Sequence, residues 1–373
     1  MSLPEGSTSA STVLVTGAMG QLGKRVTEIL LRRGRSVVAL DLDNETTRAV
    51  ARELEPRAGQ PGRLVPAYVD LLDAEAVREV VLAQAPDVVV HLAAIVAPPC
   101  YRNPEFARRV NVEGTENLLQ AALALAAPPS VVLASSTSVY GSRNPYLHPE
   151  PLTATTPLNP VDCYGEDKVA AEALVAGSGL PYSILRLGGI ISTDKLAGPQ
   201  SDYLVLIRAT PRDNRLHTVD ARDAALAFAN AADLGSAIDG KVLLIGGNDT
   251  CMLVQREVED SVMEAMGLGR LGRSVGLPGD PTDERGWGLT DWMDTTEAQE
   301  LLAFQVHGWS ETLAWIRGAQ GPRRAAMRAA GPVLRPLMRG AFALQQRREK
   351  RGPYADPWEL IGRTYGDEVL ARR

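Results

Sequence analysis

Cysteine, histidine and aromatic residues are scarce in this chain of 373 residues. The three cysteines, at positions 100, 163 and 251, form neither an even set nor a paired metal-binding spacing. This scarcity favours a reduced, cytoplasmic protein over a secreted protein held by disulfides. The four histidines form no HExxH or similar cluster, so the sequence predicts no metal site.

Long apolar runs are also missing. No stretch approaches the ~18–20 apolar residues that a membrane-spanning helix needs. The opening, MSLPEGSTSA, lacks the basic and apolar regions of a signal peptide, so residues 1–10 are expected to be a disordered lead. The formal net charge of -6 argues against general nucleic-acid affinity. The chain is long enough for one large domain or two closely joined ones.

Short apolar runs alternate with amphipathic stretches through the first half of the chain. Such runs, separated by helices, are typical of parallel strands buried on both faces. The pattern therefore predicts an α/β fold with a Rossmann-type doubly wound parallel sheet. The predicted strands are 12–16, 36–41, 64–69, 87–92, 130–135 and 182–187. The predicted helices between them are 21–33, 44–54, 73–84, 104–126 and 164–177.

The alternation ends after the sixth predicted strand. The chain then becomes rich in glycine, proline and charge, before a predicted helix over 218–232 and a strand over 241–245. Two further helices are predicted near 253–266 and 295–303. The expected units are a sheet domain over 11–187 to which 217–245 return, a smaller mixed substrate lobe over 188–318, and a basic helical extension over 319–373.

The tail from residue 321 onwards differs in composition from the rest of the chain. It contains twelve Lys or Arg residues against five acids. A basic amphipathic helix of this kind can lie on an anionic membrane surface, or pack on the protein or a sister subunit with its arginines solvated. Pro332, Pro336 and Gly340 argue against one long helix. The apolar residues at helical spacing are Leu334, Leu337, Met338 and Phe342.

Three glycines follow the first predicted strand at three-residue spacing, in the sequence TGAMGQLG. A pyrophosphate needs a tight turn, a backbone without an obstructing Cβ, and the positive end of a helix. Gly17, Gly20 and Gly23 meet these needs in turn, the last by allowing close packing of helix on strand. The spacing is GxxGxxG and not GxGxxG, and taken alone it is also typical of an ordinary strand–helix turn.

An aspartate ends the second predicted strand. Asp41 lies where a carboxylate accepts hydrogen bonds from both ribose hydroxyls of a dinucleotide and repels a 2′-phosphate. No arginine follows directly, since the next residues are Leu42 and Asp43, so NAD is predicted over NADP. The alternative is that Asp41 only caps a strand end. Asp70, which closes the third strand, can bind the adenine amino group or have no such role.

Tyr164 and Lys168 are four residues apart in a predicted helix, so their side chains share one face. Tyrosine titrates near ~10, and a neighbouring ammonium lowers that pKa. A phenolate so placed takes a proton from a substrate alcohol while hydride leaves its carbon. Ser136, at the end of the fifth strand, can orient the same oxygen. The YxxxK pattern alone is equally typical of an amphipathic helix with a solvated lysine.

Together these motifs resemble those of the extended short-chain dehydrogenases/reductases, in the NAD-dependent epimerase/dehydratase group, over about residues 11–315. The motifs that carry the resemblance are TGAMGQLG, Asp41, VDL at 69–71, HLAA at 91–94, NVEGT at 111–115, SSTSVYG at 135–141, YGEDK at 164–168, LRLGG at 185–189 and HTVDARDAA at 217–225.

The resemblance implies specific roles for residues at the matching positions. Asn111 would stiffen the site from its helix, and homodimers would form through the helices near 104–126 and 164–177. The catalytic residues would be the orienting Ser136, the acid/base Tyr164 and its partner Lys168. The NAD-binding residues would be Gly17, Met19, Gly20, Gln21, Leu22, Asp41, Asp70, Leu71, Ala93, Tyr164 and Lys168.

Some positions depart from the family pattern. Thr137 stands where some dehydratases place an acid, which argues against simple dehydratase chemistry. Asp167, usually a small residue, is expected to face solvent, although it could weaken Lys168. Gly189 replaces an asparagine of the sugar-nucleotide members, which argues against a nucleotide sugar. The basic, apolar tail leaves a lipid- or steroid-like alcohol open. The arginines that could bind a diphosphate are Arg208, Arg212 and Arg215.

Two classes of function remain after these observations. In the first, the protein oxidises a secondary alcohol to a ketone with NAD, and either releases the ketone as a dehydrogenase or returns hydride to the other face as an epimerase. The substrate is then a small alcohol or ketone. In the second, the protein is a non-catalytic NAD-binding sensor or scaffold. Such members usually lack the tyrosine or the lysine, and both are present in this sequence.

Overall fold

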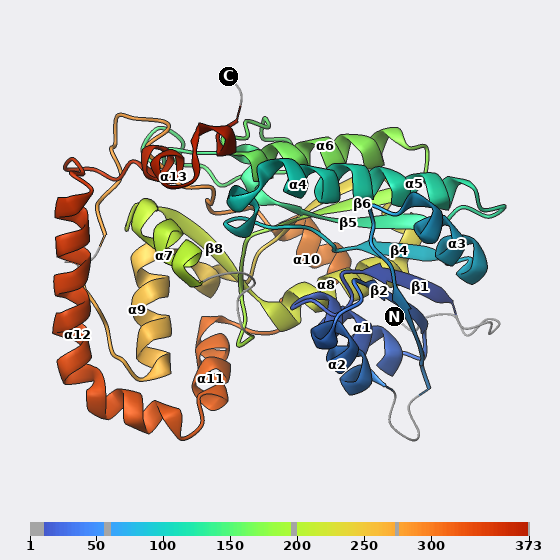
Figure 1. Ribbon diagram of the computed structural model, residues 1–373, viewed down its shortest axis with the longest axis horizontal. Coiled ribbons are helices and arrows are strands. Elements are labelled where there is room, and N and C mark those ends of the chain that lie inside the picture. The colour runs from blue at the N-terminus through green and yellow to red at the C-terminus, as the bar shows by residue number, and fades with distance from the viewer. Residues whose placement is uncertain (1–10, 56–60, 195–199, 273–275, 372–373) are drawn as a thin grey trace.

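The computed structural model describes residues 11–55, 61–194, 200–272 and 276–371. The lead predicted at residues 1–10 lies outside the described residues. The main sheet has seven strands in the order β3-β2-β1-β4-β5-β6-β9, and every neighbouring pair is parallel (Figure 1). This arrangement confirms the predicted doubly wound α/β fold.

The strands of this sheet coincide with the apolar runs of the sequence to within one residue. β9 joins the sheet beside β6, so the second half of the chain returns to the sheet after the intervening lobe. The bounds are β1 Thr12–Thr16, β2 Ser36–Asp41, β3 Arg63–Tyr68, β4 Val88–His91, β5 Ser130–Ser136, β6 Tyr182–Leu187 and β9 Lys241–Ile245.

Helices cover both faces of the sheet, because alternate residues of each strand point to opposite sides. Val13 and Val15 of β1 join the apolar cluster of one face, whereas Leu14 joins the cluster of the other. The first face packs against α1 Gly23–Arg32, α2 Glu45–Leu54, α8 Ala221–Leu234 and α10 Thr296–Leu302. The second packs against α3 Ala74–Gln84, α5 Gly114–Leu123 and α6 Cys163–Gly177.

Two predicted helices differ from the structure. The helix predicted over 104–126 is interrupted: α4 Pro104–Arg108 leads into a single π-helical turn, η2 Arg109–Glu113, before α5. The helix predicted over 218–232 begins too early, because residues 215–220 form strand β8 Arg215–Asp220. Asp220 then caps α8 by accepting a hydrogen bond from the backbone of Arg222 at 2.9 Å.

A second, smaller sheet lies in the lobe that follows β6. Its order is β10-β8-β7, with β8 antiparallel to β10 and parallel to β7. The elements of the lobe are β7 Gly189–Ile191, α7 Gln200–Ala209, β10 Met252–Val254, α9 Gln255–Met266 and α11 Trp309–Ala319. The short 3-10 turns are η1 Pro99–Arg102, η3 Thr137–Tyr140, η4 Gly235–Ile238, η5 Asp249–Cys251 and η6 Asp367–Val369.

The basic tail forms two helices, α12 Arg323–Arg348 and α13 Pro357–Tyr365. Pro332 and Pro336 were expected to weaken a long helix, but α12 runs through both prolines without ending. It bends instead (Figure 1), as helices do where proline removes an N–H donor. Within the described part of the chain, no helix combines the length and apolar character needed to cross a membrane.

Candidate active site

The glycine loop lies at the carboxyl edge of the sheet, between β1 and β4, where the strand order reverses. Gly17 has a φ of +63°, and a Cβ on it would lie 3.0 Å from Cα of Ala93. A Cβ on Gly23 would overlap the carbonyl oxygen of Gly17. The loop is therefore closed tightly on itself and on the end of β4. This crevice is where open parallel sheets bind dinucleotides.

Asp41 is tied to this loop by its carboxylate. Oδ2 accepts a hydrogen bond from the backbone N–H of Met19 at 2.9 Å, and Oδ1 accepts one from Leu42 at 2.9 Å. Burial raises the pKa of Asp41, and these two hydrogen bonds oppose the rise. The nearby arginine on α2, Arg48, is held by Asp43 at 2.5 Å. The residues present fit a dinucleotide with free ribose hydroxyls, because the half-buried carboxylate faces the loop and the local arginine is already paired.

The other predicted cofactor residues lie around the same edge. Gln21 and Leu22 are half-buried directly before α1. Asp70 is exposed just beyond β3, and its carboxylate accepts a hydrogen bond from the backbone of Leu72 at 3.0 Å. Leu71 is buried, and its carbonyl accepts a hydrogen bond from Asn117 of α5 at 2.9 Å.

Tyr164 lies in the first turn of α6, where a cap fixes the start of the helix. Asp162 accepts a hydrogen bond from the backbone of Gly165 at 2.9 Å and another from the hydroxyl of Tyr101 at 2.6 Å. The side chain of Ser136, at the end of β5, hydrogen-bonds Ser138 at 3.1 Å and lies close enough to Tyr164 to lower the pKa of its hydroxyl. Two groups that are 28 residues apart in sequence therefore meet at the carboxyl edge of the sheet.

The electrostatics of Tyr164 differ from the sequence expectation. A lowered pKa was expected from Lys168, but burial raises the pKa of Tyr164 well above its usual value. Cys100 and the carboxylates of Asp162 and Asp167 raise the pKa further, whereas Ser136 lowers it. Desolvation of the phenolate is therefore the dominant effect, and Tyr164 is a neutral phenol near pH 7.

Lys168 is buried one turn along α6 from Tyr164. Its ammonium donates a hydrogen bond to the carbonyl of Ala134 at 2.7 Å and lies 5.8 Å from the centroid of the Tyr164 ring. Burial lowers the pKa of Lys168 to about 8, and Glu172 and Asp167 oppose the shift. Lys168 therefore adds positive charge beneath the tyrosine without touching its hydroxyl.

Asp167 does not face solvent as expected; it is buried. Its carboxylate accepts hydrogen bonds from Arg108 at 3.1 Å and from the amide of Asn111 at 3.2 Å. Asn111 lies in the π-helical turn and also exchanges two hydrogen bonds with the backbone of Ile95, at 2.8 and 3.1 Å. This linkage matches the bracing role predicted for Asn111 and attaches it to α6.

Several supporting contacts were not predicted from the sequence. The carboxylate of Asp194, beyond β7, pairs with Lys24 at 2.6 Å and Arg25 at 2.5 Å at the start of α1. The buried Cys100 and Cys163 also belong to one apolar cluster with Tyr164. Only the Asp162 cap carried a local signal, an aspartate directly before a helix. The remaining contacts depend on the tertiary fold.

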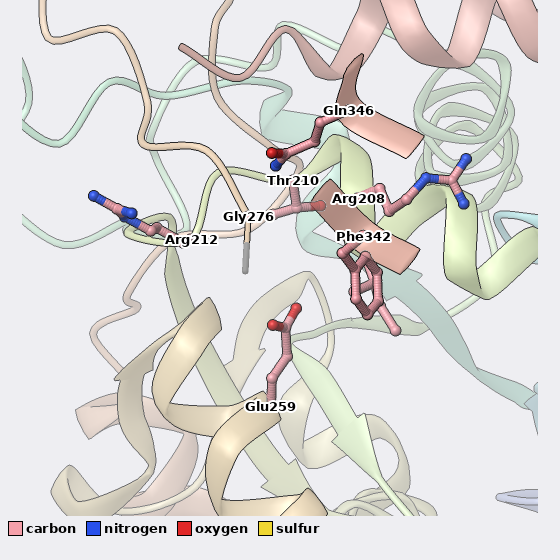
Figure 2. A pocket seen from close by; sticks show the side chains of 8 residues that line it. Arg208, Thr210, Arg212, Glu259, Gly276, Phe342 and Gln346 are labelled. Atoms are coloured by element: carbon pink, nitrogen blue, oxygen red, sulfur yellow. The ribbon is translucent and has the colours of Figure 1, made fainter. Parts of the chain in front are cut away.

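Of the three arginines suggested for a diphosphate, two line one pocket and the third lies elsewhere. Arg208 and Arg212 line a small pocket against α12 (Figure 2), and Arg208 pairs with Glu349 at 3.0 Å. Arg215 lies over the ring of Trp292, 4.6 Å from its centroid. Of the two departures near the site, Thr137 is buried in η3, and Gly189 opens β7.

The sequence profile of the NAD dependent epimerase/dehydratase family matches residues 13–235, which is more than half of the chain. The chain belongs to this family. The glycine loop, Asp41, Ser136, Tyr164 and Lys168 all lie within the matched region.

Known family relatives act on different substrates. UDP-arabinose 4-epimerase 1 of Arabidopsis thaliana is 30% identical over 188 residues, which cover 49% of this chain and 43% of the relative. D-erythronate dehydrogenase of Cupriavidus necator is 32% identical over 168 residues, which cover 44% of this chain and 49% of the relative. The chain thus matches less than half the length of each relative.

Solved structures share the fold over most of the chain. The structure of MoeE5 in complex with UDP-glucuronic acid and NAD is 25% identical, with a TM-score of 0.62, and the match covers 82% of this chain and 97% of MoeE5. The UDP-glucose 4-epimerase of Thermus thermophilus in complex with NAD is 23% identical, with a TM-score of 0.65, and the match covers 83% of this chain and 99% of that enzyme. The family is NAD-dependent, and the glycine loop and Asp41 fit that cofactor.

Proposed function

We propose that this protein oxidises a secondary alcohol to a ketone, with Tyr164 as the acid/base and Ser136 as the group that orients the reacting oxygen. The observation that carries the proposal is the position of Ser136 beside Tyr164, close enough to lower the pKa of the phenol, with the buried Lys168 ammonium one turn further along α6. NAD, when bound, supplies the hydride acceptor.

The side chains have distinct roles in this proposal. Ser136 holds the substrate oxygen by a hydrogen bond, and Tyr164 exchanges a proton with that oxygen. The buried ammonium of Lys168 favours the phenolate over the neutral phenol. Because the pKa of Tyr164 is raised, the phenol is ready to donate a proton to a ketone at neutral pH, whereas alcohol oxidation requires the phenolate. Oxidation therefore accelerates with increasing pH.

An NAD-retaining nucleotide-sugar epimerase is the second candidate, and the same three residues would perform it. UDP-arabinose 4-epimerase 1 among the relatives supports this alternative. The paired Arg208 and the separate position of Arg215 weigh against a diphosphate held by these arginines. D-erythronate dehydrogenase supports the dehydrogenase instead.

Cofactor retention separates the two candidates. The purified protein is denatured, and the supernatant is assayed for released NAD(H). Near-stoichiometric release, with sugar-nucleotide interconversion that needs no added NAD, indicates an epimerase. A protein without bound cofactor that reduces added NAD in a screen of sterols, hydroxyacyl compounds, polyols and sugar nucleotides at alkaline pH indicates a dehydrogenase.

A non-catalytic NAD-binding sensor or scaffold is the third candidate. The complete set of Ser136, Tyr164 and Lys168 argues for catalysis. If NAD binds but no substrate class in the screen is turned over, and Tyr164→Phe changes nothing measurable, the catalytic proposal is wrong.

A further inference from the structure

Helix α12 presents an apolar stripe to solvent. Val333 is 64% exposed, Leu337 63% and Leu344 50%, which places them among the most exposed large apolar side chains of the described residues. Their spacings of four and seven residues place them on one face of the helix beyond the bend. On the same side, a Cβ on Gly340 would meet no atom within 4 Å. This stripe faces away from the protein.

The opposite face of α12 holds the helix on the lobe. Arg324 donates a hydrogen bond to the carbonyl of Ala265 at 2.9 Å, and Arg339 donates one to Leu271 at 2.7 Å. Gly331 is buried against the backbone of Leu268. The residues of the stripe are therefore not the residues that hold α12 on the lobe.

A basic cluster adjoins the stripe. Arg347 and Arg348 at the end of α12, and Lys350 just beyond it, are exposed. Within the residues that the structure describes, no acid lies within ion-pair distance of these three cations. Arg348 follows Leu337 by eleven residues, three helical turns, and so lies on the stripe side. Exposed apolar side chains ending in unpaired cations are typical of helices that lie on an anionic interface.

The charge of α12 shows which kind of partner fits this surface: a second copy of the chain, a nucleic acid or an anionic lipid surface. Residues 321–348 contain seven arginines and no acid, whereas the whole chain has a formal net charge of -6. A second copy pairing through α12 would bring arginines against arginines without a compensating carboxylate. The phosphates of a nucleic acid would pair with the cations, but the apolar stripe would remain in contact with water. Anionic lipid satisfies both the cations and the stripe.

We propose that α12 docks the protein reversibly on an anionic lipid surface, with Val333, Leu337 and Leu344 inserted among the headgroups and Arg347, Arg348 and Lys350 paired with lipid phosphates or carboxylates. The inference is independent of the catalytic proposal, since none of these residues lies at the glycine loop or beside Tyr164.

The test is co-sedimentation of the full chain with phosphatidylcholine vesicles, with and without phosphatidylserine. We expect binding to the phosphatidylserine vesicles that weakens as salt increases, because screening affects exposed charges first. Replacing both Arg347→Gln and Arg348→Gln is expected to reduce the bound fraction at least fivefold, and Leu337→Ser several-fold. The control for the arginine variant is the double variant Arg52→Gln with Arg78→Gln, on α2 and α3. The control for Leu337→Ser is Leu147→Ser. All three control residues are exposed and lie outside α12.

Three outcomes overturn the proposal. The first is equal pelleting with neutral and anionic vesicles, or equal loss of binding in the control variants. The second is binding to duplex DNA that Leu337→Ser leaves unchanged, with no vesicle binding, which identifies a nucleic-acid surface. The third is dimerisation without vesicles that Leu337→Ser abolishes, which identifies a second copy as the occupant. Circular dichroism and thermal melting of every variant exclude misfolding as the cause.

Discussion

At the scale of single residues, the reacting tyrosine is controlled by what surrounds it. Burial, Cys100 and two nearby carboxylates raise the pKa of Tyr164, while Ser136 lowers it. The phenol therefore needs alkaline pH to act as a base in alcohol oxidation, and serves as an acid at neutral pH.

Tyr164→Phe is expected to lower kcat by about 10²- to 10⁴-fold, because general acid–base catalysis contributes in that range. NAD binding is expected to persist, since the glycine loop is unchanged. For the wild type, the oxidation rate should increase as pH rises from neutral, reflecting the raised pKa of Tyr164. The measurements are kcat against pH and NAD titration calorimetry, with Tyr146→Phe, an exposed tyrosine, as the control. Full activity of Tyr164→Phe would contradict the assignment.

Gly23→Ala tests the closure of the loop. A Cβ at this position would overlap the Gly17 carbonyl oxygen, so the loop has to shift. We expect a loss of about 1–3 kcal/mol in the free energy of unfolding, as for overpacked sites, and weaker NAD binding. Gly318→Ala in α11 is the control, because its Cβ meets nothing within 4 Å and the helix should gain ~0.5–1 kcal/mol. Urea unfolding of both variants gives the comparison.

Residues with local signals could be predicted, and residues defined by distant partners could not. The spacing of Gly17, Gly20 and Gly23, and the four-residue step from Tyr164 to Lys168, follow from turn and helix geometry alone. Asp167 was expected to face solvent because its partners, Arg108 and Asn111, lie 59 and 56 residues away. Only the packing of α4 and η2 on α6 makes it a buried group.

At the scale of elements, the pocket between α7, α9 and α12 carries a half-buried acid. Figure 2 shows Glu259 extending from α9 toward the space between Arg212 and Phe342. Burial raises its pKa to about 7 from 4.5, Asp260 adds to the shift, and the hydrogen bond from Gln255 opposes it. The unfolded chain ionises this group at lower pH than the folded chain does. The resulting penalty to folding is absent below pH 4.5, grows up to about pH 7 and is constant above it.

Glu259→Gln is therefore expected to stabilise the protein by up to about 3 kcal/mol above pH 7, and to have little effect below pH 4.5. Thermal unfolding across this pH range measures the difference. Glu53→Gln, an exposed glutamate on α2, serves as the control. A stabilisation that is equal at both ends of the range would show that Glu259 is not the titrating group.

Elements were predictable where one local pattern dominated. The strands of the main sheet are continuous apolar runs, and their bounds agree with the sequence. β8 was missed because its mixed sequence, RLHTVD, runs directly into the helical pattern of α8. The prolines of α12 cost helix stability locally, but contacts such as Arg339 with Leu271 hold the helix on its neighbour. Such contacts depend on residues far along the chain.

At the scale of the whole molecule, cofactor choice is the property that a binding experiment tests directly. Asp41 faces the glycine loop, and Arg48 is paired with Asp43. NADH at about 100 times its Kd is expected to add ~2.7 kcal/mol to the free energy of unfolding, and NADPH much less. Asp41→Asn should reduce the difference between the stabilisation that NADH gives and the stabilisation that NADPH gives. Thermal shifts with each cofactor give the measurement, and a stronger shift with NADPH in the wild type would contradict it.

The segment between β6 and β9 is attached to the main sheet at both of its ends. These strands are parallel neighbours, from Ser183 opposite Lys241 to Leu187 opposite Ile245, and everything from Gly188 to Gly240 is inserted between them. The inserted region cannot separate as an independent body, because both of its ends are hydrogen-bonded into one ladder. A calorimeter should accordingly record a single heat-absorption peak for sheet and insertion together.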